Sequence, residues 1–312
     1  MIHLFALLSL LLCGVCYTGF QNSSHFHNTS NRRSLLLLVF GGALLLRLLL
    51  AYTTHGFSND IACFAAWADR IFTLGPGQFY SAEMFTDYPP GFMYVLYLIG
   101  ALRSLLQIPY YSDLHILLLK LPAILCDIAC GFLLYREAVK RLHFSDLQGI
   151  FAASAYLFQP AVILNSSCWG QVDSVYTLMI ILMCLFLMKG NLLPAYAVYG
   201  LGVLLKPQML IFTPVLLAGI WDHVFLQDFS WRKFFYNLCG GLVVICGMLL
   251  LCAPFGLTAA ISQYTSTLGS YEYAAINAYN FWGLLGMNWV DQNTIFLFLP
   301  CKTCLLYTSP SP

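Results

Sequence analysis

The amino-acid sequence predicts an all-α polytopic membrane protein, in which several helices cross a lipid bilayer. Of its 312 residues, 60% are hydrophobic and only 9% are charged, whereas soluble domains carry roughly 25% charged residues. The mean hydropathy is +0.77. Apolar stretches that approach the roughly 20 residues needed to cross a bilayer recur along the chain. Most of the molecular surface therefore requires lipid as its solvent.

The composition also excludes other kinds of site. The net charge is only +1, and no basic run has the pattern of a nucleic-acid-binding surface. The 12 cysteines lie mostly in apolar segments, and the CxxC pairs at 13–16 and 301–304 lack a partner pair or a nearby histidine. We therefore expect no nucleic-acid partner, no metal and no cofactor, and we expect most cysteines to be small buried side chains.

Basic residues orient the predicted helices, because inner loops carry an excess of lysine and arginine. Such residues precede the first long span, at 32–33, and recur at 136–141, 189 and 232–233. All of these basic residues lie on the inner side of the membrane only if the apolar run at 91–107 does not cross it. This run must then lie in the outer interface. The sequence then predicts seven spans, at about 34–54, 113–135, 147–165, 173–188, 193–205, 208–221 and 234–253.

This topology divides the chain into three parts. Residues 1–33 hold an inner linker after an apolar segment, which is either a further helix or the product of a misplaced start. A cleaved signal peptide is disfavoured, because it would place Arg32 and Arg33 outside. Residues 34–300 form the transmembrane domain. The ending, 301–312, breaks the apolar pattern and looks like translated adapter sequence, so we expect the natural chain to continue.

The first outer loop contains the first candidate residues. Apolar residues recur at helical spacing after Asp60, which predicts an amphipathic interfacial helix from about 60 to 73. Asp60 is a candidate site residue, although an acid at this place can also simply face water.

The motif DYPPGF comes later in the same loop. Pro89 and Pro90 fix two φ angles and keep Tyr88 out of the α region. A rigid corner of this kind places Asp87 and Tyr88 reproducibly, as a binding site requires. Alternatively, the two prolines only start the helix that follows.

A second outer segment, NSSCWGQVDS, joins two spans through very few residues. Trp169, Gln171 and Asp173 supply an aromatic surface, an amide and a carboxylate, which together suit a sugar or another polyhydroxyl ligand. Gly170 permits a left-handed turn or a close approach. In the alternative interpretation, Trp169 belongs to the interfacial aromatic belt and Asp173 caps the next helix.

Cationic residues form a third group. Lys206, next to Gln208 in the motif LLKPQ, can hold a phosphate as a point charge or extend to the interface. Arg47 and Lys120 each lie seven residues inside a predicted span, about 10 Å from its outer end. Asp127 lies one heptad deeper than Lys120. Intramembrane charges of this kind indicate function, or else buried structural pairing.

The last group lies at 271–286, where tyrosine and tryptophan accompany Asn277 and Asn280. This composition suits carbohydrate stacking and hydrogen bonding, or an interfacial cover.

Taken in order, six motifs resemble those of integral-membrane glycosyltransferases of the GT-C class: SNDIACFAAWA, DYPPGF, KLPAILCDI, NSSCWGQVDS, LLKPQ and INAYNFWGLLG. The resemblance covers about 34–290. It is closest to bacterial mannosyltransferases related to the second mannosyltransferase of GPI-anchor assembly. The dolichol-phosphate-glucose-dependent glucosyltransferases of N-glycan assembly are similar more distantly.

This resemblance implies a seven-helix core with interfacial helices in a large first outer loop, which agrees with the span count from charges. It also implies transfer of a hexose, with mannose favoured, from a polyprenyl-phosphate donor to a hydroxyl of a lipid- or glycan-linked acceptor. Asp60 would act as general base on the outer side of the membrane, and the anomeric configuration would invert. Lys206, assisted by Arg47 or Lys120, would stabilise the leaving phosphate.

The remaining candidates would orient the sugar or the acceptor: Asp87, Tyr88, Trp169, Gln171, Asp173, Gln208, Asn277 and Asn280. Members of this class usually continue with further helices after the 271–286 loop, so a chain that ended at residue 312 would have an incomplete site.

Two other classes compete with this interpretation. A transporter or flippase would also use broken helices and intramembrane charges, but the halves show no inverted repeat and the polar groups lie near the outer surface. A non-enzymatic assembly subunit would need only the composition. The short loops favour a bacterial plasma membrane over the endoplasmic reticulum.

Overall fold

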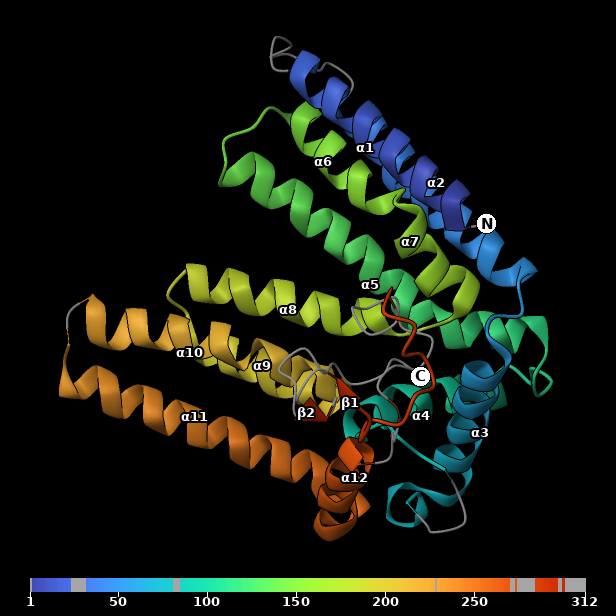
Figure 1. Ribbon diagram of the computed structural model, residues 1–312, viewed down its shortest axis with the longest axis vertical. Helices are drawn as coiled ribbons and strands as arrows, with labels where there is room; N and C mark the ends of the chain where they lie inside the picture. The colour runs from blue at the N-terminus through green and yellow to red at the C-terminus, as the bar shows by residue number, and fades with distance from the viewer. Residues whose placement is uncertain are drawn as a thin grey trace.

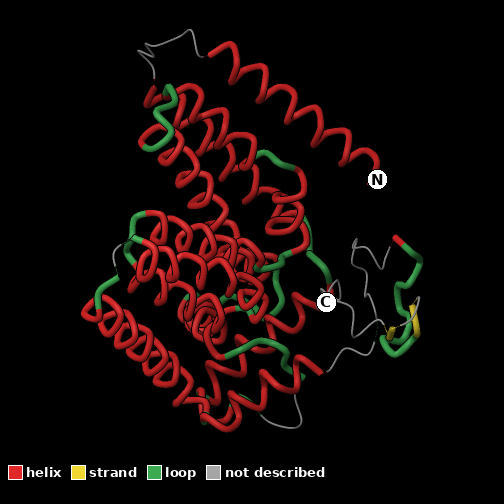
Figure 2. The backbone as a smooth tube through the Cα atoms, turned by 60° about the vertical axis from the view of Figure 1, so that its left-hand side comes forward, coloured by secondary structure: helices red, strands yellow, loops and turns green. Residues whose placement is uncertain are grey.

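The computed structural model describes residues 2–23, 32–80, 85–227, 229–269, 273, 284–296 and 299–300. Helices make up almost all of this structure, as Figure 1 and Figure 2 show. β1 (Ile295–Phe296) and β2 (Leu299–Pro300) form one short antiparallel pair near its end. The predicted class, an all-α polytopic membrane protein, is confirmed.

Most of the helices form one bundle. Its members are α1 (Ile2–Ser23), α2 (Arg32–Thr53), α5 (Asp113–Lys140), α6 (Asp146–Leu157), α7 (Pro160–Ile163), α8 (Asp173–Met188), α9 (Leu192–Leu205), α10 (Thr213–Trp221) and α11 (Trp231–Cys252). Short irregular turns extend some of them: the π-helical turns η2 (Leu164–Trp169) and η4 (Asp222–Leu226), and the 3₁₀ turns η3 (Pro207–Phe212) and η5 (Ala253–Phe255).

Among the described residues, four helices are long and apolar enough to cross a membrane. They are α2, α5, Pro207–Leu226 and Trp231–Phe255. A fifth span results if α6 and the segment Pro160–Trp169 are joined across their 51° bend. The two further predicted spans are the shorter apolar helices α8 and α9, which pack against each other. All seven predicted segments are thus helical, and a seven-span crossing stays a prediction.

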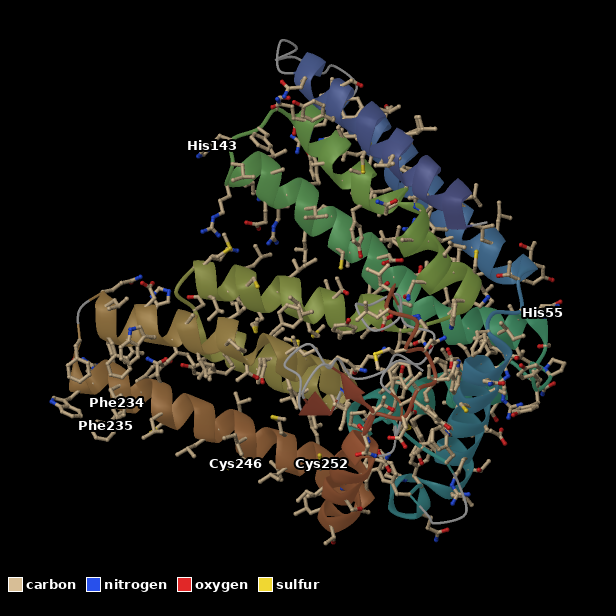
Figure 3. The ribbon with its side chains drawn as sticks, in the orientation of Figure 1. His55, His143, Phe234, Phe235, Cys246 and Cys252 are labelled. Atoms are coloured by element: carbon tan, nitrogen blue, oxygen red, sulfur yellow. The ribbon has the colours of Figure 1, made fainter. Side chains whose placement is uncertain are left out.

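The loops predicted to share the inner side meet at one end of the bundle. Arg32, at the start of α2, pairs with Asp146 of α6 at 3.2 Å. The Arg141 side chain donates to the Met188 carbonyl at 3.4 Å, which joins the α5–α6 loop to the α8–α9 loop. Figure 3 shows His143 of this end and His55, just after α2, far apart on the molecule.

The opposite end carries the helices of the first loop. α3 (Ser58–Leu74) confirms the predicted amphipathic helix, and it packs against α4 (Pro90–Leu105) through a small core. η1 (Pro76–Gln78) lies between them, and α12 (Leu257–Gly269) lies at the same end (Figure 1). α4 has 16 residues and is among the shorter apolar helices. The buried face shared by α3, α4, α5 and α8 supports the pocket described next.

Candidate functional site

A pocket of about 220 Å³ opens between α3, residues 87–90 (the DYPP corner) and the turn before α8. It is lined by Phe57, Asn59, Asp60, Cys63, Phe64, Trp67, Phe85, Asp87, Tyr88 and Gln171. Four of the residues chosen from sequence as site candidates are therefore in one pocket. None of the described lining residues is a lysine, arginine or histidine.

Asp60 is the best-positioned acid of the pocket. Its Oδ2 accepts hydrogen bonds from Trp169 Nε1 at 2.8 Å and from Gln171 Nε2 at 2.5 Å. Burial raises the pKa of the Asp60 carboxyl above its ordinary value, against the opposing effect of these two bonds. No donor from the described part of the chain bonds its Oδ1, so this oxygen is left for a ligand or water.

Two glycines let the backbone close around this acid. Gly56 has φ +82° and Gly170 has φ +90°, both in the region that side chains disfavour. A Cβ on Gly56 would lie 2.7 Å from the Trp169 carbonyl, and one on Gly170 would lie 2.5 Å from Ile61 Cδ1. The predicted left-handed turn at Gly170 is confirmed, and it brings Trp169 and Gln171 to Asp60.

Phe57 contacts Trp169 through both its backbone and its ring. Its N–H donates to the Trp169 carbonyl at 2.9 Å, and the two rings lie 4.9 Å apart between centroids. The loop after α2 and the turn before α8 are thereby fixed to each other.

The DYPP corner forms the second wall. Pro90 is the first residue of α4, so the prolines both start the helix and fix the corner. Tyr88 is buried, and burial together with the charge of Asp87 raises the pKa of its phenol well above the ordinary value. The protonated hydroxyl donates to Gln171 Oε1 at 3.4 Å. The Thr86 carbonyl accepts a hydrogen bond from Gln263 of α12, which holds the corner from outside.

Lys206 lies beside the pocket but is paired. Its Nζ contacts Asp173 Oδ1, and Asn165 Nδ2 donates to the other oxygen of Asp173 at 2.9 Å. Lys206 is 6% exposed and lies over the rings of Tyr88 and Tyr176 at 5.8 and 5.6 Å. Its positive charge is therefore largely compensated within the protein, which leaves little of it for a phosphate.

Arg47 and Lys120 are not among the described lining residues of the pocket. Both are fully buried. Lys120 Nζ donates to the Ala51 carbonyl at 3.2 Å and to the Thr54 carbonyl at 2.7 Å, at the end of α2. Arg47 Nε pairs with Asp127 at 3.3 Å. These contacts match buried structural pairing, and they do not fit the donor-phosphate role expected of the two cations.

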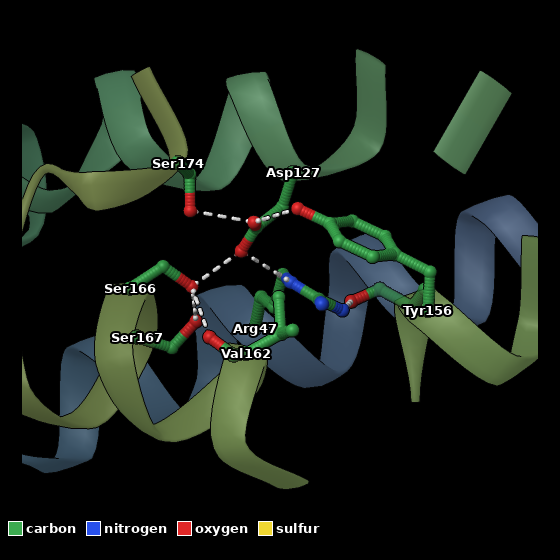
Figure 4. A network of polar contacts seen from close by, with 8 residues as sticks. Arg47, Asp127, Tyr156, Val162, Ser166, Ser167 and Ser174 are labelled. Atoms are coloured by element: carbon green, nitrogen blue, oxygen red, sulfur yellow. Dashed lines mark hydrogen bonds and ion pairs between the residues drawn. The ribbon is translucent and has the colours of Figure 1, made fainter. Parts of the chain in front are cut away.

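Asp127 is the centre of a buried polar network, shown in Figure 4. Besides Arg47, its oxygens accept from Ser166 and Ser174 at 2.6 Å each, and from Tyr156 at 3.1 Å. These four partners come from α2, α6, η2 and α8, so the network joins four elements to α5, which carries Asp127. Ser166 and Ser174 stand on either side of Trp169 and Gln171, so the network holds both ends of the segment that reaches Asp60.

Of the remaining candidates, Gln208 is not among the described lining residues of the pocket. Gln208 lies in η3, and its Oε1 is buried without a hydrogen-bond partner among the described residues. Asn277 and Asn280 lie outside the described residues. In the part of the chain that the structure describes, no group of three or more His, Cys, Asp or Glu side chains is placed to hold a metal ion.

Several lining residues were not singled out from the sequence. Cys63, Phe64 and Trp67 follow Asp60 by three, four and seven positions, which places them on one face of α3. The sequence pattern after Asp60 predicts an amphipathic interfacial helix, through the helical spacing of Ile61, Phe64, Ala65 and Ala68. The same periodicity could have identified a wall continuous with Asp60.

The fold and the site define a polytopic helical membrane protein with a half-buried acidic and aromatic pocket beside α3 and α4. Residues 35–275 match the family described as GPI transamidase subunit PIG-U. This match covers more than half of the chain, and the chain belongs to this family, whose members are GT-C-like membrane proteins. It does not extend to the mannosyltransferases to which the motifs pointed. The search of curated proteins found no match.

Proposed function

We propose that this chain is a membrane subunit of a GPI transamidase, the complex that joins proteins to a glycosylphosphatidylinositol (GPI) glycolipid. The family match over residues 35–275 is the observation that supports this proposal. The subunit would reside in the endoplasmic reticulum rather than in the bacterial plasma membrane that the short loops favoured.

Within such a subunit, the pocket around Asp60 would bind the polar part of the glycolipid. A carboxylate, an amide and aromatic rings are the groups that hold sugars, and they line this pocket together. The surrounding bundle would keep the lipid part of the ligand in the bilayer. The subunit would then supply binding and orientation, while another chain of the complex would cleave and form bonds.

Expression in cells that lack their own member of this family would test the proposal. The tagged chain should co-purify with the other transamidase subunits and restore a GPI-anchored reporter to the cell surface. We expect Asp60→Asn to assemble normally but to restore the reporter several-fold less well. Asp113→Asn removes an acid that is half exposed and outside the pocket, and it is the matched control. Failure of the wild-type chain to assemble would contradict the proposal.

A second candidate function is the sugar transfer that the motifs imply, and the geometry of Asp60 favours it. An acid with a raised pKa and one open oxygen is suited to take the proton of an acceptor hydroxyl. That hydroxyl would attack the anomeric carbon, the lipid phosphate would leave, and the configuration would invert. The leaving phosphate would need a cation, and Lys206 could serve only after release from Asp173.

One assay separates the two functions. Membranes containing the chain are incubated with radiolabelled polyprenyl-phosphate mannose or glucose, and transfer is compared between wild type and Asp60→Asn. Transfer that is lost in the variant would establish the glycosyltransferase. We expect neither donor to be consumed.

A further inference from the structure

A second pocket, of about 390 Å³, lies between α9, α11 and the helix that α10 continues into η4. Both α10 and α11 pack against α9, and Figure 1 shows the three helices together. α11 contributes side chains from Phe234 to Met248 to the wall, a length of about 21 Å at the rise of an α-helix. The pocket shares no described lining residue with the one around Asp60. It is therefore a separate, elongated cavity between helices of the bundle.

The lining of this second pocket is almost entirely apolar. The few polar side chains that reach it are bonded within the protein. The Tyr196 hydroxyl donates to Asn237 Oδ1 at 3.3 Å, and Asn237 Nδ2 donates to the Lys233 carbonyl at 2.9 Å. The Tyr199 hydroxyl is hydrogen-bonded to Thr213. Because a water molecule needs polar partners that this lining does not offer, hydrocarbon is the medium that suits the cavity.

The pocket opens sideways on the surface of the bundle. Leu238, Leu242 and Ile245 line it on α11, and each is about half exposed. At the other end of its length, α9 and α11 are in close contact, since a Cβ on Gly200 would lie 2.8 Å from Met248 Sδ. A ligand can therefore enter from the bilayer at the side of the bundle.

The dimensions of the pocket discriminate between possible occupants. About 390 Å³ along about 21 Å gives a mean cross-section of about 19 Å². A transmembrane helix of a partner, at least about 10 Å in diameter, has a cross-section of about 80 Å² and cannot enter. A single unbranched hydrocarbon chain is narrow enough, whereas the methyl branches of a polyprenyl chain make it wider.

We propose that this pocket holds one acyl chain of a membrane phospholipid, which fills the gap between α10 and α11. The chain passes Gly241, where an added Cβ would meet no atom within 4 Å. Because the pocket begins in the first turn of α11, next to the basic pair 232–233 of the predicted inner side, the lipid belongs to the inner leaflet. Its binding does not depend on the glycolipid proposed for the pocket around Asp60.

Two glycines of α11 provide a matched test. Gly241 and Gly247 both have open space around an added Cβ, but only Gly241 is among the described lining residues of the pocket. Gly241→Leu should occupy the path of the acyl chain, and Gly247→Leu adds the same side chain to the same helix outside the pocket. Native mass spectrometry of the full chain, purified in detergent, counts the phospholipid molecules that stay bound. We expect one on the wild type and on Gly247→Leu, and none on Gly241→Leu.

A photoreactive probe locates the lipid in the wild-type chain without relying on a variant. Phosphatidylcholine with a diazirine near the end of one acyl chain is added to the chain in mixed micelles, and the crosslinked peptides are identified. We expect crosslinks to concentrate on 216–225 and 234–248, and unlabelled phosphatidylcholine to displace them.

Three results would overturn the inference. They are equal retention of phospholipid by Gly241→Leu and the wild type, crosslinks spread evenly over the apolar helices, and displacement of the probe by polyprenyl phosphate but not by phosphatidylcholine. The last result would assign the pocket to a branched chain.

Discussion

At the scale of single residues, the environment of Asp60 makes its protonation a measurable property. Burial raises the pKa of this carboxyl in the folded protein, so the ionised form is less favourable there than in the unfolded chain. Stability is therefore lost as the pH rises from the ordinary value of about 3.9 through the raised one.

Asp60→Asn should remove this pH-dependent loss of folding stability. The variant keeps an oxygen that accepts hydrogen bonds from Trp169 and Gln171. We expect the melting temperature of the variant to exceed that of the wild type by about 1–2 °C at pH 7. The difference should shrink as the pH falls through the raised pKa, and it should disappear below about 3.9, where the carboxyl is neutral in both the folded and the unfolded chain. Thermal unfolding in detergent, followed at several pH values, measures this. A difference that grows toward low pH would mean that the carboxylate is stabilising.

Gly170 is a second residue whose role can be tested alone. Alanine there must adopt φ +90°, and its Cβ would lie 2.5 Å from Ile61 Cδ1 and 3.3 Å from Lys120 Cε. We expect Gly170→Ala to destabilise the protein by about 1–3 kcal/mol. Gly42→Ala, in α2 with nothing within 4 Å of the added Cβ, is the control and should stabilise by about 0.5–1 kcal/mol. Equal melting temperatures for the two variants would contradict this explanation.

At the scale of elements, the buried network around Asp127 determines how the helices assemble. Removing the carboxylate with Asp127→Ala leaves the Arg47 cation buried without its partner, which costs about 3–5 kcal/mol. The double variant Arg47→Met with Asp127→Asn removes both charges and keeps acceptors for the serines. We expect it to recover most of the melting temperature and of the folded yield measured by size-exclusion chromatography. A double variant as unstable as Asp127→Ala would show that the ion pair itself is needed.

Local features of the elements could be predicted from the sequence, whereas contacts between distant charged residues could not. The helix at 58–74 and the turn at Gly170 follow from periodicity and from glycine chemistry, both of which are local. The pairing of Lys206 with Asp173, and of Arg47 with Asp127, joins residues 33 and 80 positions apart. No local pattern determines which distant charges meet. For this reason the sequence did not reveal that two of the three predicted phosphate-binding cations, Lys206 and Arg47, are paired with acids.

At the scale of the whole molecule, the two ends of the bundle should lie on opposite sides of the membrane. His55 and His143 mark these ends, and both side chains are exposed. In a background without native cysteines, His55→Cys and His143→Cys should react with an impermeant maleimide from opposite sides. Gln107→Cys, after α4, should react from the same side as His55→Cys. Reaction of residue 107 together with residue 143 would mean that α4 crosses, and the seven-span topology would be wrong.

The π-helical turn η2 has a consequence for how the length of this segment can change over evolutionary time. Each hydrogen bond of a π-helix encloses one more residue than in an α-helix, because it joins residues five apart rather than four apart. Deleting one residue from Leu164–Trp169 would let the turn relax to α-helix and rotate everything after it by about 100° relative to Ser166. Ser166 would still reach Asp127, but Trp169 would point away from Asp60. An insertion or deletion here would separate these two contacts, so related chains should keep the length of this segment.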